Sequence, residues 1–109
     1  MIISFKSKEL RDNAINEFLG MQNLNPITLE LLKTILTSLN AASSLKDLPH
    51  PIKGKFNYIN ENICLGGITN LDLHFRNAHL DAPKTSDGII DWDRVSRLQL
   101  TYIGEKHAN

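Results

Sequence analysis

The sequence predicts an α+β domain in which two N-terminal helices pack on one face of a small, mainly antiparallel sheet. In the first half, two stretches repeat apolar residues at the spacing of an amphipathic helix. In the second half, short runs alternate apolar and polar side chains, which is the period of a half-buried strand. The length of 109 residues fits one domain with one core, so we assign 1–109 to a single unit. Packing the helices on one sheet face buries both patterns.

Local capping signals mark the two helices. Ser7 can accept a hydrogen bond from the first turn of a helix that Gly20 would end. Asn25 can cap a second helix, because its side-chain oxygen can accept a hydrogen bond from the first turn. Pro26 suits the first position of that helix, because the amide hydrogen that proline lacks would have no partner there. This second helix is expected to run to about Ala42.

Strands are expected in the remaining apolar runs, at 1–5, 56–59, 63–68, 71–75 and 97–103. In the last of these, Leu98, Leu100 and Tyr102 alternate with polar residues and are expected to share the apolar side. Gly66 and Gly67 are expected to form a kink or part of a turn.

Residues 77–96 differ in composition and predict a long loop insertion with a short helical turn near Asp91. Trp92 is expected to cover the core, and a contact patch for a partner is the alternative. No particular role is expected for His79, and its spacing to His74 and Asp81 matches no metal template.

Composition excludes several classes of protein. Lys and Arg together number 12, as do Asp and Glu, and a net charge of zero makes broad nucleic-acid binding less expected than for a basic chain. The one cysteine, Cys64, excludes an intrachain disulfide and a multi-thiolate zinc site, and we expect it to be a small buried hydrophobe. No apolar run or leader indicates a membrane span or secretion, so we expect a soluble cytoplasmic protein without cofactor or metal.

Five stretches then follow one another in a familiar order: 1–12, 41–48, the His-Pro-Ile-Lys-Gly run at 50–54, 63–75, and the terminal His107. In this order they resemble HigB-type toxins of the RelE superfamily, the toxic halves of bacterial type II toxin–antitoxin pairs. The strand Asp72-Leu73-His74 also resembles the YafQ branch of that superfamily.

The resemblance implies a compact RelE-like fold and ribosome-dependent cleavage of messenger RNA. It also implies neutralisation by a cognate antitoxin, with operator DNA bound only through the toxin–antitoxin complex. The chemistry requires a base for the ribose 2′-hydroxyl, an acid for the leaving 5′-oxygen and cations for the phosphate, but no metal. Histidine suits either proton-transfer role because imidazole titrates near roughly pH 6.5.

By position, His50 and His107 match the catalytic histidines of the family, and His74 matches one only in the YafQ branch. The cations expected to hold phosphate are Lys53, Arg76 and Lys106. From the residues alone, His74 on a polar strand face is as readily a solvent-facing or hydrogen-bonded side chain.

The sequence also departs from the family. Asn70 stands where HigB-type toxins carry an arginine, and Glu105-Lys106 replaces an Asp-Tyr pair. These changes, with the zero net charge, motivate a second hypothesis: a catalytically degenerate RelE-like module that binds an antitoxin or another protein. An unrelated α+β domain with chance matches is the third.

Overall fold

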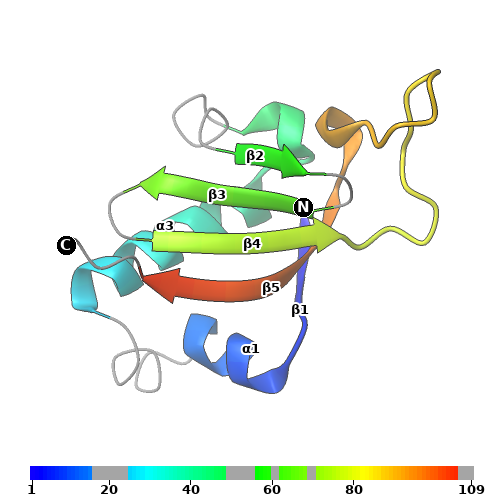
Figure 1. Cartoon of the computed structure of the whole chain (residues 1–109). Helices are drawn as coiled ribbons and strands as arrows, with labels where there is room; N and C mark the ends of the chain where they lie inside the picture. The colour runs from blue at the N-terminus through cyan, green and yellow to red at the C-terminus, as the bar shows by residue number, and fades with distance from the viewer. Residues whose placement is uncertain (16–24, 49–55, 60–61, 69–70, 106–109) are drawn as a thin grey trace.

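The computed structural model describes residues 1–15, 25–48, 56–59, 62–68 and 71–105, and these form a five-stranded sheet with one long helix packed against it. The expected α+β class is confirmed. The strands are β1 (Ile2–Phe5), β2 (Phe56–Ile59), β3 (Asn62–Ile68), β4 (Leu71–Asn77) and β5 (Arg97–Glu105). Their order across the sheet is β1-β5-β4-β3-β2 (Figure 1).

The sheet is mainly antiparallel, as the sequence predicts, and one parallel pair makes it mixed. The pairs β2-β3, β3-β4 and β4-β5 are antiparallel, whereas β1 runs parallel to β5. Successive hairpins dictate the first three pairings. Strand β1 comes from the other end of the chain, before both helices, so no hairpin joins it to β5 and sets its direction.

The main helix, α3 (Pro26–Ala41), begins as its sequence predicts. The Asn25 side-chain oxygen accepts a hydrogen bond of 2.9 Å from the amide of Ile27, and Pro26 opens the first turn. One face of α3 is buried against the sheet, through Leu29, Leu32, Ile35, Leu36 and Leu39. The last carbonyls of a helix have no partner within it. At the end of α3, the backbone nitrogen of Met1 donates to such carbonyls, including that of Leu39 at 3.1 Å.

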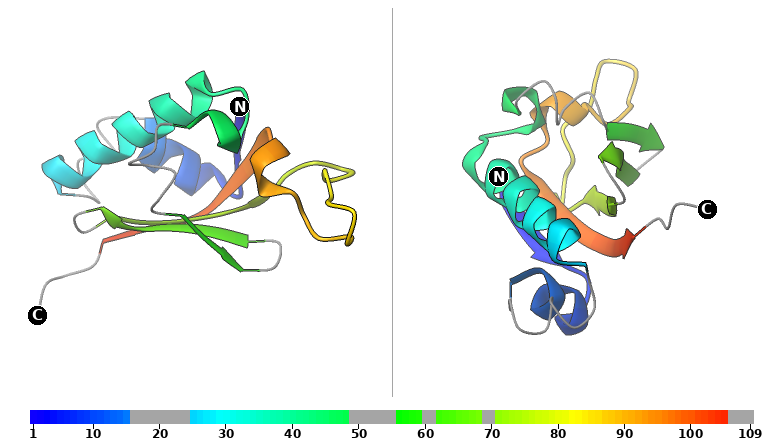
Figure 2. Two further views of the ribbon diagram at one scale, coloured as in Figure 1. Left: turned by 90° about the horizontal axis from the view of Figure 1, so that it is seen from above. Right: turned by 90° about the vertical axis from the view of Figure 1, so that its left-hand side faces the viewer.

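A shorter helix, α1 (Lys8–Ile15), follows β1 and contacts α3, β1 and β5. Ser7 accepts a hydrogen bond of 3.2 Å from the amide of Leu10, as the sequence predicts for a cap. The predicted continuation of this helix to Gly20 lies outside the described residues. Both helices lie on the same side of the sheet, and no described helix covers its other side (Figure 2). We call that side the open face.

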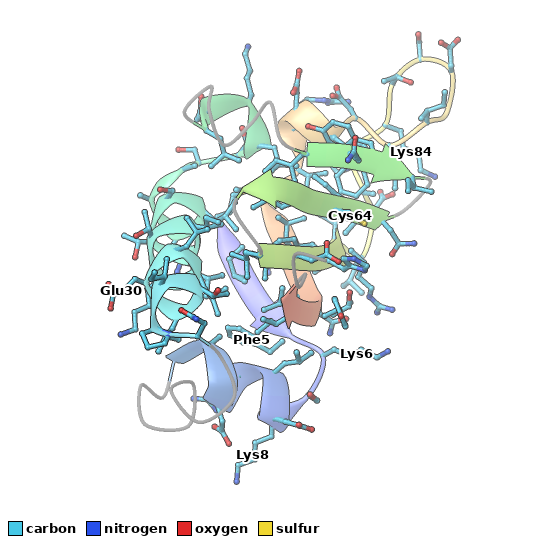
Figure 3. The ribbon with its side chains drawn as sticks, turned by 60° about the vertical axis from the view of Figure 1, so that its left-hand side comes forward. Phe5, Lys6, Lys8, Glu30, Cys64 and Lys84 are labelled. Carbon is cyan, nitrogen blue, oxygen red and sulfur yellow. The ribbon has the colours of Figure 1, made fainter. Side chains whose placement is uncertain are left out.

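The core lies between α3 and the sheet. Alternation along β4 buries Leu71, Leu73 and Phe75, whose neighbours Ile63 and Leu65 on β3 are buried on the same side. Figure 3 shows the same alternation on the first strand, with Phe5 pointing between the helices and the sheet and Lys6 pointing away. Gly66 and Gly67 belong to β3 rather than to a turn, and the β3-β4 register is irregular between Leu65 and Ile68.

The β4-β5 connection starts at Ala78, one residue later than predicted, because Asn77 still pairs with Leu98. A helical turn at Trp92–Arg94, η2, was expected near this position. Trp92 is half-buried and packs against the core, so its predicted core role is confirmed. The centroid of its ring lies 5.7 Å from that of Tyr58.

The rest of this connection is held by its own hydrogen bonds. At its tip, the Thr85 amide donates to the Ile89 carbonyl at 2.8 Å, and Gly88 takes the turn's left-handed position with a φ of 81°. At its base, His79 Nε2 accepts from the Ser96 amide at 3.0 Å. His79 therefore ties the start of the connection to its end, a role that its sequence position did not indicate.

No helix in the described part of the chain is long and apolar enough to cross a membrane.

Candidate functional site

Four of the six sequence-predicted site residues lie outside the described residues, namely His50, Lys53, Lys106 and His107. The other two, His74 and Arg76, lie on β4. Their positions alternate with buried core residues, so both side chains belong to the open face of the sheet. The candidate site is therefore built around the centre of β4.

Asp72 is the first partner of His74. Its Oδ1 lies 3.3 Å from His74 Nε2, and the two side chains are 22% and 41% exposed. A contact of this kind favours the imidazole orientation in which Nε2 faces the carboxylate. The other ring nitrogen, Nδ1, is then not committed to Asp72. A neutral imidazole in this orientation carries its hydrogen on Nε2 and can accept a proton at Nδ1.

Tyr102 is the second partner of His74. The two residues are directly paired between β4 and β5, and their ring centroids lie 4.8 Å apart with the planes tilted by 48°. This geometry is within the range of favourable contacts between rings. Tyr102 is 47% exposed, so the pair presents aromatic surface to solvent.

The position of Tyr102 corrects the sequence prediction, which placed it on the apolar side with Leu100. Leu100 pairs with Phe75, but Tyr102 pairs with His74, so β5 contains one residue more than β4 between these pairs. The extra residue is Thr101, whose hydroxyl donates to the His74 carbonyl at 3.1 Å. Such a bulge moves every later side chain to the opposite face.

Gly104 completes the arrangement. It pairs with Asp72 on β4 and lies two residues after Tyr102, on the same face. A side chain at position 104 would overlap the Tyr102 ring, because that ring lies over the glycine. Glycine at this position therefore allows Tyr102 to lie flat along β5 beside Asp72 and His74.

Cationic residues lie on the same face of the sheet as this cluster. Arg76 follows His74 on β4, Arg97 begins β5, and Lys6 continues the outward alternation of β1 (Figure 3). Among the described open-face side chains of the strands, Asp72 is the only carboxylate, and it contacts His74. The net charge of zero thus conceals a local excess of positive charge on the open face.

Cys64 lies on the neighbouring strand, paired with His74. The expectation that it is buried is wrong, because Ile63 and Leu65 take the core side of β3 and leave Cys64 half-buried on the open face. Within the described ranges, no three His, Cys, Asp or Glu side chains are placed to hold a metal ion.

The sequence identified His74 and Arg76 but missed Asp72, Tyr102 and Gly104 as their neighbours. Asp72 could have been found from its two-residue spacing to His74 on one strand face. Tyr102 could not, because its face depends on a bulge that local alternation does not reveal.

The arrangement offers a histidine for proton transfer, a carboxylate that orients it, an exposed aromatic ring and several cations. Comparisons of the chain with protein-family models, with curated proteins and with solved structures found no match.

Proposed function

We propose that this chain is a toxin of the RelE superfamily that cleaves messenger RNA on the ribosome, with the open face of the sheet as its RNA-binding surface. The observation that carries the proposal is the contact of His74 with both Asp72 and Tyr102, on a sheet face where Arg76 is exposed two residues further along β4. The RelE-like layer of two N-terminal helices against the sheet is part of the proposal. It agrees with α1 and α3 lying on the side opposite this cluster.

Each part of the cluster suits one requirement of RNA cleavage. In the orientation that directs Nε2 to Asp72, His74 can take the proton of a ribose 2′-hydroxyl at Nδ1. The 2′-oxygen then forms a bond to the adjacent phosphorus, and the bond from phosphorus to the 5′-oxygen breaks. That leaving oxygen must receive a proton from an acid, which we assign to His50 or His107.

The remaining side chains hold the RNA in place. Tyr102 offers a ring on which a base can stack, a contact that every base can make. The Arg76 guanidinium can hold two oxygens of one phosphate. Lys53 and Lys106 are proposed as further phosphate ligands, and a cognate antitoxin is proposed to cover the same face.

Growth and cleavage assays test this assignment. We would induce the wild-type chain, His74→Gln, His50→Ala and His107→Ala in a bacterium without the antitoxin, and map cleavage of messenger RNA on purified ribosomes. Wild type should stop growth and cut the RNA. His74→Gln should do neither, because an amide keeps a polar side chain of similar reach but cannot transfer the proton.

Soluble expression and an unchanged circular dichroism spectrum would serve as controls for folding. Full cleavage by His74→Gln would remove His74 from the catalytic role. If soluble wild type neither stops growth nor cleaves RNA but co-purifies with a small partner, the degenerate binding module becomes the better description. That alternative is favoured by the zero net charge and by the changes at Asn70 and Glu105-Lys106.

A further inference from the structure

A cavity of about 500 Å³ lies where β4 runs into the β4-β5 connection. Six of its lining residues carry polar or charged side chains, namely Asn62, Arg76, Asn77, His79, Asp81 and Lys84. The connection extends from the end of the sheet at this point (Figure 1). The size and the polar lining suit a small charged ligand better than an apolar one.

The wall of the cavity is held in place before any ligand arrives. His79 is fixed on two sides, because its amide donates to Asn77 Oδ1 at 3.1 Å and its Nε2 accepts from Ser96. Arg94 braces the far side by donating from Nη2 to the Lys84 carbonyl at 2.6 Å and from Nε to Asp91 Oδ2 at 2.8 Å. A preformed wall reduces the ordering cost of binding.

Two cations face the cavity without a carboxylate partner in the described part of the chain. Arg76 and Lys84 line it and are exposed, and neither forms an ion pair among the described residues. The Lys84 backbone carbonyl, not its ammonium group, binds Arg94. A guanidinium and an ammonium group at one cavity suit a phosphate group. Asp81 and Asn62 add an acceptor for a sugar hydroxyl and an amide for a base edge.

Arg76 connects this cavity to the site around His74. It is two residues further along β4 on the same face, which is roughly 7 Å away at the rise of a strand. That distance is comparable to the step between successive phosphates in an extended RNA strand. The cavity is thus placed to take the nucleotide beside the one at Tyr102.

We propose that the cavity between the end of β4 and residues 78–91 is a subsite for a phosphate-bearing ribonucleotide of a single-stranded RNA, adjacent to the bond that is cut. This inference rests on the proposed function, because the RNA at His74 supplies the neighbouring nucleotide. It assigns the inserted connection the role of extending the RNA-binding face beyond the strands.

Binding of an uncleavable RNA tests the subsite without depending on catalysis. The probe is a short fluorescent single-stranded RNA with 2′-O-methyl riboses, titrated with the full chain at several salt concentrations. Lys84→Ala should weaken binding about three- to tenfold and lower the salt dependence by about one counterion. Asp81→Asn should strengthen binding of this probe, because its 2′-O-methyl riboses offer Asp81 no 2′-hydroxyl and the substitution removes a negative charge from the cavity while keeping the side chain's size.

Lys8→Ala is the matched control. Lys8 is also an exposed lysine, and it lies on α1, far from Lys84 (Figure 3). The control should bind the RNA as wild type does. If Lys84→Ala and Lys8→Ala have equal effects, the subsite is wrong and the open-face proposal still stands. If wild type does not bind the RNA at all, both fail.

A competition arm separates RNA from a free nucleotide, which carries the same phosphate chemistry. Adenosine 5′-monophosphate and inorganic phosphate are titrated against the bound RNA. Weak displacement of the RNA by both compounds supports a subsite within a longer RNA-binding site, provided that Lys84→Ala abolishes the displacement by each compound to the same extent. If the mononucleotide binds tightly through Lys84 and the RNA does not compete with it, the cavity serves a free nucleotide and the proposal is overturned.

Discussion

The ring of Tyr102 lies over Gly104, so that a Cβ atom at position 104 would overlap it. The glycine is buried by this contact, although it lies on the open face of the sheet. The same ring contacts His74 on the neighbouring strand, so the two contacts together define where Tyr102 lies.

Gly104→Ala should therefore displace Tyr102 from His74. The overlap involves the far end of a side chain that can rotate away, so we expect a loss of about 1 kcal/mol or less in the free energy of unfolding. RNA affinity should fall because the stacking ring moves. Near-ultraviolet circular dichroism would report the displacement of the ring, thermal unfolding the loss of stability, and titration with RNA the change in affinity. An unchanged RNA affinity would show that Tyr102 does not contact the RNA.

Asp72→Asn should lower the rate of RNA cleavage with little change in stability. The amide keeps the size of the carboxylate but loses the negative charge that lies 3.3 Å from His74 Nε2. We expect kcat to fall tenfold or more while KM changes little, because the lost interaction forms mainly in the transition state. Asp47→Asn, which changes an exposed carboxylate outside the sheet, is the control. Equal rates for the two variants would contradict the role of Asp72.

His79→Ala should loosen the β4-β5 connection. The substitution leaves the Ser96 amide without its acceptor, which we expect to cost about 1 kcal/mol. Hydrogen exchange and limited proteolysis within residues 78–96 should become faster, while exchange in β3 should not. Ser86→Ala, at the exposed tip of the same connection, provides the comparison. Unaltered exchange in His79→Ala would mean that the contact does not hold the connection.

Two substitutions on α3 should separate its buried and exposed faces. Leu32 is fully buried, and Leu32→Ala should cost about 2–5 kcal/mol because it leaves a cavity. Ile27 on the same helix is 73% exposed, and Ile27→Ala should change the free energy of unfolding by at most about 0.5 kcal/mol. Denaturant titration measures both. Similar values would contradict the packing of α3 on the sheet.

Most elements could be predicted because their signals are local. The cap at Asn25, the proline after it and the apolar spacing of the following turns determine α3. Period-2 alternation likewise determined β4, including the open-face position of His74 and Arg76. These patterns depend on hydrogen bonds and burial within a few residues of each other, so they can be read without the fold.

The tertiary structure alone decided three relationships, each between residues far apart in the chain. Strand β1 runs parallel to β5, although no local turn joins the two strands and sets their relative direction. His79 binds Ser96 across the intervening connection. Tyr102 faces His74 because Thr101 bulges where β5 pairs with β4, and local alternation predicts the opposite face. Register between strands is set by pairing, and one extra residue changes which side chains form the site.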